Sequence, residues 1–287
     1  MTASTTGLVR HADPTIRRKV DEFASALTRG DSILVRPKAD YDGIDRVVAT
    51  ISGAAAAATG RLLVTDLESE ELTQTIESVE HPESSAGSTP LFAFHTSGST
   101  GRPKAVAVGH DALAHFLAHH RTTTLAPFAG RPLRIAQTLP LEFDGSWDTL
   151  QGLFLGHEVH VLPRDVTQDP ARTVAAVRAE GLEFVDTTPT VLAALLDEGL
   201  LDPGHPLRMI SVGGEACPPA LWHRLLAEPG LQVANFYGPT EATVVACGAQ
   251  VDGSLPVRIG LPLDGWDLAV VDEAGHPVSD GQDGELV

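Results

Sequence analysis

The chain has 287 residues, 43% of them hydrophobic, and its 20 Lys and Arg face 38 Asp and Glu, a formal net charge of −18. DNA and RNA are poor candidate partners, because a polyanion would meet a repulsive field. No apolar stretch approaches the ~20 residues that cross a bilayer, and the N-terminus lacks the basic start and apolar run of a signal peptide, so we expect a cytoplasmic protein with no membrane partner.

The first 95 residues alternate between helical and extended patterns. Helical spacing of apolar residues and short apolar runs predict three helices and three strands: helices over 14–29, 42–57 and 68–79, and strands over 32–36, 62–65 and 91–95. Residues 81–90, rich in Pro, Ser and Gly, are typical of an exposed loop. This alternation favours a parallel sheet covered by helices on both faces.

The same alternation continues to about residue 250 and then changes. Short apolar runs and helical stretches predict strands over 157–162, 183–186, 209–212 and 233–236, and helices over 170–179 and 189–198. Beyond Cys247, short strands over 257–259 and 268–271 separated by turns indicate a small β-rich region. The predicted fold class is α/β, with parallel-sheet, helix-covered subdomains followed by the start of a small β-rich subdomain.

A loop rich in Gly, Ser and Thr directly follows the strand over 91–95. Its sequence is Thr96-Ser-Gly-Ser-Thr-Gly-Arg-Pro-Lys104, which does not have Walker A spacing. Two glycines let the backbone curl closely around a ligand, hydroxyl side chains add donors for phosphate oxygens, and Lys104 adds a positive charge. A flexible Ser/Gly turn alone would not need this combination. The pattern predicts a polyphosphate site at Thr96, Ser97, Gly98, Ser99, Thr100, Gly101 and Lys104.

A second motif, Asn235-Phe-Tyr-Gly-Pro-Thr-Glu, lies downstream. Tyr237 offers a flat face for a purine, and Gly238 allows a tight turn. Thr240 offers a hydroxyl for phosphate, and Glu241 is a hard oxygen ligand for Mg²⁺. Together the two motifs predict a nucleotide site whose cofactors are ATP and Mg²⁺.

Both motifs resemble those of the acyl-adenylate-forming superfamily, which includes acyl-CoA ligases, luciferases and the adenylation domains of nonribosomal peptide synthetases. The resemblance runs from about Leu91 to the last residue, with one departure at Ala105, where a further glycine is usual. It implies that the loop holds the β- and γ-phosphates of ATP, and that Thr240, Glu241 and Lys104 have catalytic roles. It also implies cofactor contacts at Gly213, Gly214, Glu215, Asn235, Tyr237, Gly238 and Thr240.

The segment Leu141-Glu-Phe-Asp-Gly-Ser-Trp147 resembles the peptide-synthetase branch. There the carboxylate of the Phe-Asp pair receives the α-ammonium group of an amino acid, and acyl-CoA ligases usually carry a histidine in this region. Asp144 would supply a buried anion that a zwitterionic substrate neutralises and a fatty acyl chain does not. The alternative role for Asp144 is a helix cap at Gly145.

Alignment with the family proposes further pocket residues: Asp186, Ile210, Val212, Phe236, Val244 and Val245. The segment after Ser146 is one residue short of the common pattern, so Trp147 or Asp148 takes the next pocket position. A second carboxylate at Asp186 favours a substrate side chain with an amine or hydroxyl, although Asp186 could equally hydrogen-bond the turn at 187–188.

The resemblance implies a function and a domain organisation. We expect ATP-dependent activation of an amino acid as its acyl-adenylate, with release of pyrophosphate and transfer to a carrier-protein thiol in nonribosomal peptide biosynthesis. The alternatives are an acyl- or aryl-CoA ligase core and a catalytically incompetent nucleotide-binding protein. Residues 1–287 would form the adenylation core, divided into 1–90, 91–250 and 251–287. The family's C-terminal lid with its catalytic lysine would act in cis or in trans, and the isolated chain would bind nucleotide weakly and adenylate slowly or not at all.

Overall fold

The computed structural model describes part of the chain. The described residues are 8–10, 32–35, 62–65, 90–96, 104–128, 131–140, 143–153, 155, 157–251 and 257–287. The helices expected over 14–29, 42–57 and 68–79, the loop expected over 81–90 apart from Pro90, and the glycine-rich loop over 97–103 lie outside them.

The main structural element is a large sheet with the strand order β1-β7-β6-β8-β9-β10-β11-β12. Its strands are β1 (Leu8–Arg10), β6 (Arg134–Gln137), β7 (Glu158–Val161), β8 (Phe184–Thr187), β9 (Met209–Val212), β10 (Gln232–Tyr237), β11 (Cys247–Gln250) and β12 (Leu261–Pro262). In this sheet, neighbouring strands pair in parallel in the order β1, β7, β6, β8, β9 and β10. Strands β11 and β12 then add in antiparallel orientation. The parallel part therefore has all of its carboxyl ends along one edge.

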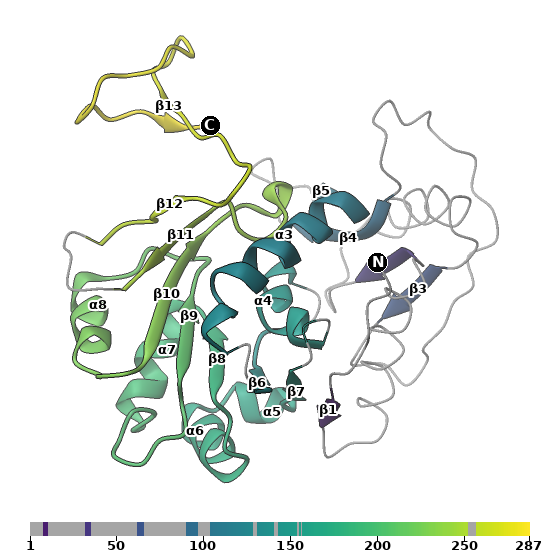
Figure 1. Ribbon diagram of the computed structural model, residues 1–287, viewed down its shortest axis with the longest axis vertical. Coiled ribbons are helices and arrows are strands. Elements are labelled where there is room, and N and C mark those ends of the chain that lie inside the picture. The colour runs from purple at the N-terminus through teal and green to yellow at the C-terminus, as the bar shows by residue number, and fades with distance from the viewer. Residues whose placement is uncertain are drawn as a thin grey trace.

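Helices cover both faces of this sheet (Figure 1). One face carries α6 (Pro170–Ala179), α7 (Pro189–Asp197) and α8 (Pro219–Leu226); the other carries α3 (His110–Thr122) and α4 (Trp147–Leu150), with a short α5 (Arg164–Thr167) beside α6. Asp169 and Thr188 cap α6 and α7 with side-chain acceptors, and each helix has Pro in its first turn.

Strand alternation divides the apolar residues into two cores. Val185, Ile210 and Val233 point toward α6–α8, and their neighbours Phe184, Met209 and Ala234 point toward α3 and α4. Because both faces are buried, these strands read as continuous apolar runs, as sequence analysis expected for a parallel sheet.

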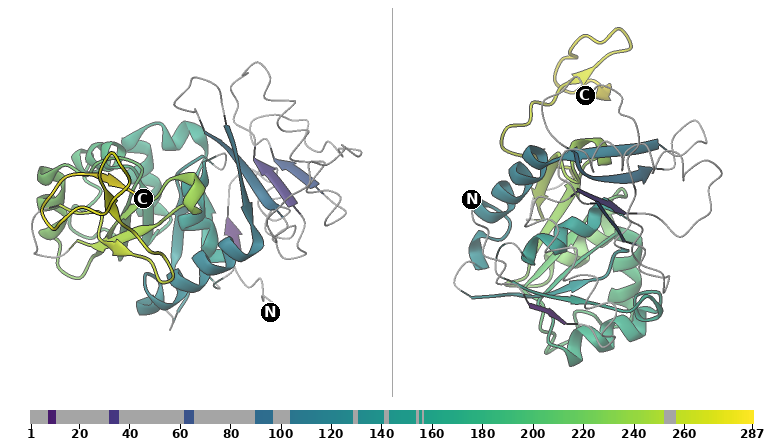
Figure 2. Two further views of the ribbon diagram at one scale, coloured as in Figure 1. Left: turned by 90° about the horizontal axis from the view of Figure 1, so that it is seen from above. Right: turned by 90° about the vertical axis from the view of Figure 1, so that its right-hand side faces the viewer.

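A smaller sheet has the order β3-β2-β4-β5 and lies beside the large one (Figure 2). Its strands are β2 (Ser32–Val35), β3 (Leu62–Thr65), β4 (Pro90–Thr96) and β5 (Lys104–Gly109). Phe94 and Val108 of this sheet belong to the same core as α3, which places α3 between the two sheets. Near the C-terminus, β13 (Val270–Val271) and β14 (Glu285–Leu286) form a separate pair that projects from the large sheet (Figure 1).

The predicted α/β class is confirmed, with strands within one or two residues of the predicted bounds at β2, β3, β4, β7, β8, β9 and β10. The strand expected over 257–259 is wrong: these residues have no regular structure, and the sheet is extended by β12 instead. Gly260, with φ of +91°, causes the difference, because a left-handed residue breaks the extended run before it can pair. Among the helices that the structure describes, none is both long and apolar enough to span a bilayer.

Candidate functional site

The segments singled out by sequence motifs follow the carboxyl ends of the parallel strands. The turn Thr240–Ala242 (η4) follows β10, the glycines 213 and 214 follow β9, and Asp186 lies near the end of β8. The 3₁₀ turn Asp144–Ser146 (η2) and helix α4 come after β6. In an open α/β sheet this edge is where ligands bind, because the strands end there and the connecting loops can carry functional side chains.

The turn after β10 has an unusual backbone. Tyr237 is 41% exposed, and Glu241 is also exposed on η4. Thr243 and Val244 have φ of 57° and 73°, a left-handed conformation that β-branched residues rarely adopt and that costs on the order of 1–3 kcal/mol each. The backbone N–H of Ala246 donates to the Tyr237 carbonyl at 2.8 Å, which fastens the end of this segment to the strand.

Gly238 makes the turn possible through close packing. A Cβ at this position would lie 2.5 Å from the Val244 carbonyl oxygen and 2.6 Å from the Val245 Cα. These atoms belong to the backbone and cannot rotate away, so only glycine fits here. The glycine of the predicted nucleotide motif therefore holds the strained segment against the end of β10.

Asp144 lies beside this turn. The Thr240 hydroxyl donates a hydrogen bond to the Asp144 carboxylate, and Glu241 is close enough to affect its charge. The Gly145 N–H also donates to Asp144 Oδ1, at 2.9 Å. Burial raises the pKa of Asp144, with the Thr240 and Gly145 hydrogen bonds acting against the increase. The structure thus brings together the predicted amine anchor and two residues of the second motif.

Two more carboxyl groups lie behind Asp144, both almost fully buried. Asp148 is on α4, which packs against β8, the strand that carries Asp186. Burial is the main reason that the pKa of Asp148 lies well above its usual value, with smaller increases from the charges of Asp186 and Asp144. Burial also raises the pKa of Asp186 to about 7, while the Ser211 hydroxyl, which donates to Asp186 Oδ1 at 2.5 Å, acts against it.

Other predicted contacts serve to fix loops. Thr190 donates its backbone N–H, at 3.1 Å, and its hydroxyl, at 2.5 Å, to the Glu215 carboxylate, and the hydroxyl bond lowers the pKa of Glu215. This ties the loop of Gly213 and Gly214 to the start of α7. The Asn235 side chain donates to the Arg258 carbonyl at 2.8 Å, which ties β10 to the segment before β12.

Not every predicted pocket residue reaches the acidic cluster. Phe236 faces α3, and its ring meets His120 edge-on at 5.3 Å. Val244 and Val245 are buried in the core on that same face. Ile210 and Val212, however, belong to the core beneath α6–α8, on the opposite face of the sheet. The residue between them, Ser211, donates to Asp186 instead, because side chains alternate along a strand.

Residues 97–103 of the predicted phosphate loop lie outside the described residues, but the loop's flanking residues are placed. Thr96 and Lys104 are backbone register partners across β4 and β5. Strand β5 in turn lies against η4. The two sequence motifs therefore belong to neighbouring elements, although their sequence positions are far apart. A cavity of about 220 Å³ also borders η4 and is lined by Ala112, His115, Phe116, Ala242, Thr243, Val245, Leu263, Gly265 and Trp266, none of them an acid of the cluster.

Comparison with known proteins identifies the family. The model of the AMP-binding enzyme family matches residues 23–287. The vanchrobactin synthetase VabF of Vibrio anguillarum is 34% identical over 207 residues, which are 68% of this chain and 7% of that protein. The L-proline–[L-prolyl-carrier protein] ligase of Streptomyces coelicolor is also 34% identical over 207 residues, 67% of this chain and 38% of the ligase.

Solved structures agree on the fold. The four-domain nonribosomal peptide synthetase AB3403, bound to AMP and glycine, has a TM-score of 0.68 at 23% identity, covering 94% of this chain and 22% of that one. The Vibrio cholerae adenylation domain AlmE, in complex with glycyl-adenosine-5′-phosphate, has a TM-score of 0.61 at 22% identity, covering 93% of this chain and 54% of AlmE. The chain belongs to the AMP-binding enzyme family, and it spans only a part of the length of these relatives.

Proposed function

We propose that this chain activates an amino acid with ATP, forming an aminoacyl-adenylate and releasing pyrophosphate, for transfer to a carrier-protein thiol. The observation that carries the proposal is the contact between Asp144 and Thr240 beside Glu241. It joins an anion suited to an α-ammonium group to a hydroxyl and a carboxylate suited to an α-phosphate and its metal ion.

In this reaction the protein mainly has to position the two reactants, and it does not need to supply a nucleophile of its own. A substrate carboxylate attacks the α-phosphorus of ATP in line with the leaving pyrophosphate, and both reactants are anionic. In this proposal Asp144 holds the α-ammonium group, Thr240 contacts the α-phosphate, and Tyr237 stacks on adenine. The phosphate loop, from Thr96 to Gly101 with Lys104, neutralises the β- and γ-phosphates.

Glu241 fits the role of Mg²⁺ ligand, because it is exposed on a turn adjacent to the proposed phosphate contact. A bound Mg²⁺ would supply positive charge to the phosphate oxygens. Gly213 and Gly214 would let the adenine approach the backbone, with Glu215 holding that loop in place through Thr190.

Partners and the final step are proposed from the relatives. One relative is named as a prolyl-carrier protein ligase and another as a phosphinothricin tripeptide synthetase, both of which support carrier-protein loading. In this proposal residues 1–287 form one adenylation core, and a lid outside these residues, in cis or in trans, contributes the catalytic lysine.

The test measures binding, so that it does not depend on the lid. We would titrate the chain with ATP and Mg²⁺, and then with stable aminoacyl sulfamoyl adenosines, by calorimetry. Each analogue is paired with a version in which hydrogen replaces the α-amine. We expect the amine to improve affinity by roughly 100-fold, because it forms a desolvated ion pair with Asp144. Asp144→Asn should remove this gain, and the control Asp165→Asn, at an exposed carboxylate, should not.

Two outcomes would contradict the proposal. Equal binding of the analogues without the α-amine would favour a carboxylate substrate such as that of a CoA ligase. Absence of binding by ATP with Mg²⁺ and by every analogue would indicate a protein that has lost the nucleotide site.

A further inference from the structure

The carboxyl groups of Asp148 and Asp186 lie in one buried cluster behind the proposed amine anchor. Asp148 is 6% exposed and Asp186 is 4% exposed. They come from α4 and β8, which pack together, and the charge of Asp186 acts directly on Asp148. Asp186 has a partner in Ser211, whereas Asp148 Oδ1 is buried without a hydrogen bond.

Among the side chains that the structure describes, no arginine lies at ion-pair distance from Asp144, Asp148 or Asp186. The imidazole of His120 approaches Asp148, with its Nε2 3.9 Å from Asp148 Oδ1, beyond hydrogen-bond length.

His120 is an independent sign of an unfilled polar site. It is fully buried, and neither of its ring nitrogens has a hydrogen-bond partner. Its imidazole approaches Asp148 from α3, while the carboxylate comes from α4. Burial lowers the pKa of His120 to about 3, so the ring is neutral and does not balance the acids. An acid and an imidazole thus point at each other without a bond, and both retain unused polar atoms.

A purely structural role does not account for this arrangement. Buried polar atoms are nearly always hydrogen-bonded, and a network built for stability would satisfy its members. Two adjacent buried carboxyls also disfavour each other's ionisation. Two acids elsewhere in this fold, Glu183 and Glu158, have arginine partners. Among the side chains that the structure describes, this cluster has no donor that carries positive charge.

We propose that the amino acid activated by this chain has a cationic side chain, an ammonium or guanidinium group held between Asp148 and Asp186. The proposal rests on the proposed function, because Asp144 must hold the α-ammonium group for the side chain to point to the cluster. The cation would donate to Asp148 Oδ1 and allow both carboxylates to ionise, with Ser211 orienting Asp186.

The test compares each cationic side chain with a counterpart that lacks the ammonium group and with a neutral polar side chain. Ornithyl and lysyl sulfamoyl adenosines would be titrated against norvalyl, norleucyl and glutaminyl counterparts. We expect the better of the two cationic analogues to bind roughly 100-fold more tightly than its uncharged match. Asp148→Asn and Asp186→Asn should each reduce this preference at least tenfold and leave ATP binding unchanged. Asp165→Asn should keep the full preference.

The outcomes separate this inference from the proposed function. If an uncharged side chain binds best, the inference is wrong and amino-acid activation stands. If neither ATP nor any analogue binds, the proposed function itself fails. The ranking of side chains by the unsubstituted chain decides the matter even where a variant fails to fold, which circular dichroism would reveal.

Discussion

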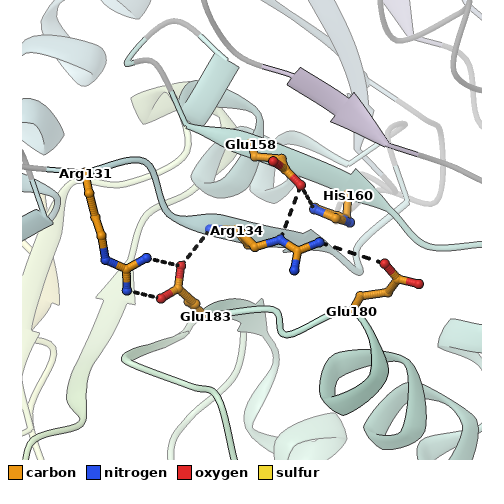
Figure 3. Close-up of polar contacts among 6 residues, drawn as sticks. All are labelled: Arg131, Arg134, Glu158, His160, Glu180 and Glu183. Carbon is orange, nitrogen blue, oxygen red and sulfur yellow. Dashed lines mark hydrogen bonds and ion pairs between the residues drawn. The ribbon is translucent and has the colours of Figure 1, made fainter.

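The two ends of the parallel sheet treat their acidic residues in opposite ways. At the amino ends of the strands, Glu183 accepts a two-pronged ion pair from Arg131 and a hydrogen bond from the Arg134 N–H at 3.1 Å. Glu158 accepts from Arg134 Nε at 3.3 Å and contacts His160 (Figure 3). At the carboxyl ends, Asp144 accepts from Thr240 and Gly145 and Asp186 accepts from Ser211, whereas Asp148 Oδ1 has no hydrogen bond, and no described arginine pairs with any of the three.

This difference distinguishes carboxylates that stabilise the fold from carboxylates that are available to a ligand. A paired carboxylate at the amino ends is already neutralised, so it can stabilise the fold and has no site to offer. An unpaired one at the carboxyl ends carries a cost in the free protein that a bound cation would remove.

The largest expected effect comes from disrupting the turn at the carboxyl end of β10 without changing any charge. In Gly238→Ala the new Cβ would meet the Val244 carbonyl at 2.5 Å, so the turn must move. We expect a loss of about 3 kcal/mol in the free energy of unfolding, at the upper end for overpacking. We also expect ATP affinity to fall at least tenfold, because Tyr237 and Thr240 move with the turn. Urea unfolding and calorimetry measure the two effects.

Gly230→Ala is the matched control for this variant. Gly230 has φ of +83°, but a Cβ there would have no atom within 4 Å. The backbone strain should cost about 1–2 kcal/mol and leave ATP binding unchanged. Equal loss of ATP binding in both variants would mean that general instability, not the turn, explains the result.

The contrast between the two ends also explains what sequence could predict. Strands β8 and β9 are buried on both faces, so their apolar runs, Phe184-Val and Met209-Ile, were recognisable without any partner. Strand β6 was missed because Arg134 begins it and Gln137 ends it. Both polar residues are explained by tertiary contacts, to Glu158 and to Thr149, that no local pattern contains.

The site residues proposed from motifs and those proposed from alignment lie in different places in the structure. Asp144 and Thr240 were proposed from separate motifs, and the structure places them in contact. Ile210 and Val212 were proposed as pocket residues, yet the strand turns them toward α7 and α8. Ser211 is the residue of β9 that reaches the acids. Side-chain alternation decides this, and it needed the strand's orientation in the sheet.

Removing an ion-paired acid at the amino ends of the strands should lower the free energy of unfolding and leave the binding of ATP and the analogues unchanged. Glu183→Gln keeps the shape but removes the charge that Arg131 and, at 3.9 Å, Arg208 share. Because Glu183 is 9% exposed as a side chain and Arg131 is more than half exposed, we expect a loss of about 2 kcal/mol, as for hydrogen bonds to charged groups. Urea unfolding measures it. A fall in ATP or analogue affinity in the folded variant would contradict the separation of the two ends.

At the carboxyl ends of the strands, removing an acid should raise the free energy of unfolding instead of lowering it. The size of this gain should depend on pH. Burial holds the pKa of Asp186 at about 7, above the 3.8 of an exposed aspartate. The folded state therefore binds more protons between these two values, and stability falls as pH rises from about 4 to 7. The other acids near this site are Asp148 and Asp144, whose pKa values burial also raises, and Glu241, while His120 stays neutral.

Asp186→Asn keeps an oxygen for Ser211 and removes the ionisation. We expect similar stability of the variant and the parent near pH 4.5, and a variant at least about 1 kcal/mol more stable at pH 8, or at least roughly 2–4 °C in melting temperature. Thermal melts at both pH values measure this. A variant that is less stable at pH 8 than at pH 4.5, relative to the parent, would show that the ionised acid stabilises the free fold.

The smallest effect should come from an ion pair that belongs to neither end. Arg224 Nη1 lies 2.8 Å from Asp197 Oδ1 and links α8 to α7, but the two side chains are 45% and 71% exposed. Solvent screens such a pair, so Arg224→Ala should cost about 0.5 kcal/mol or less. Urea unfolding with and without 1 M NaCl measures this, and salt should abolish most of the difference. A cost as large as that of Glu183→Gln would mean that burial does not determine which pairs stabilise the fold, and the contrast between the two ends would lose its energetic basis.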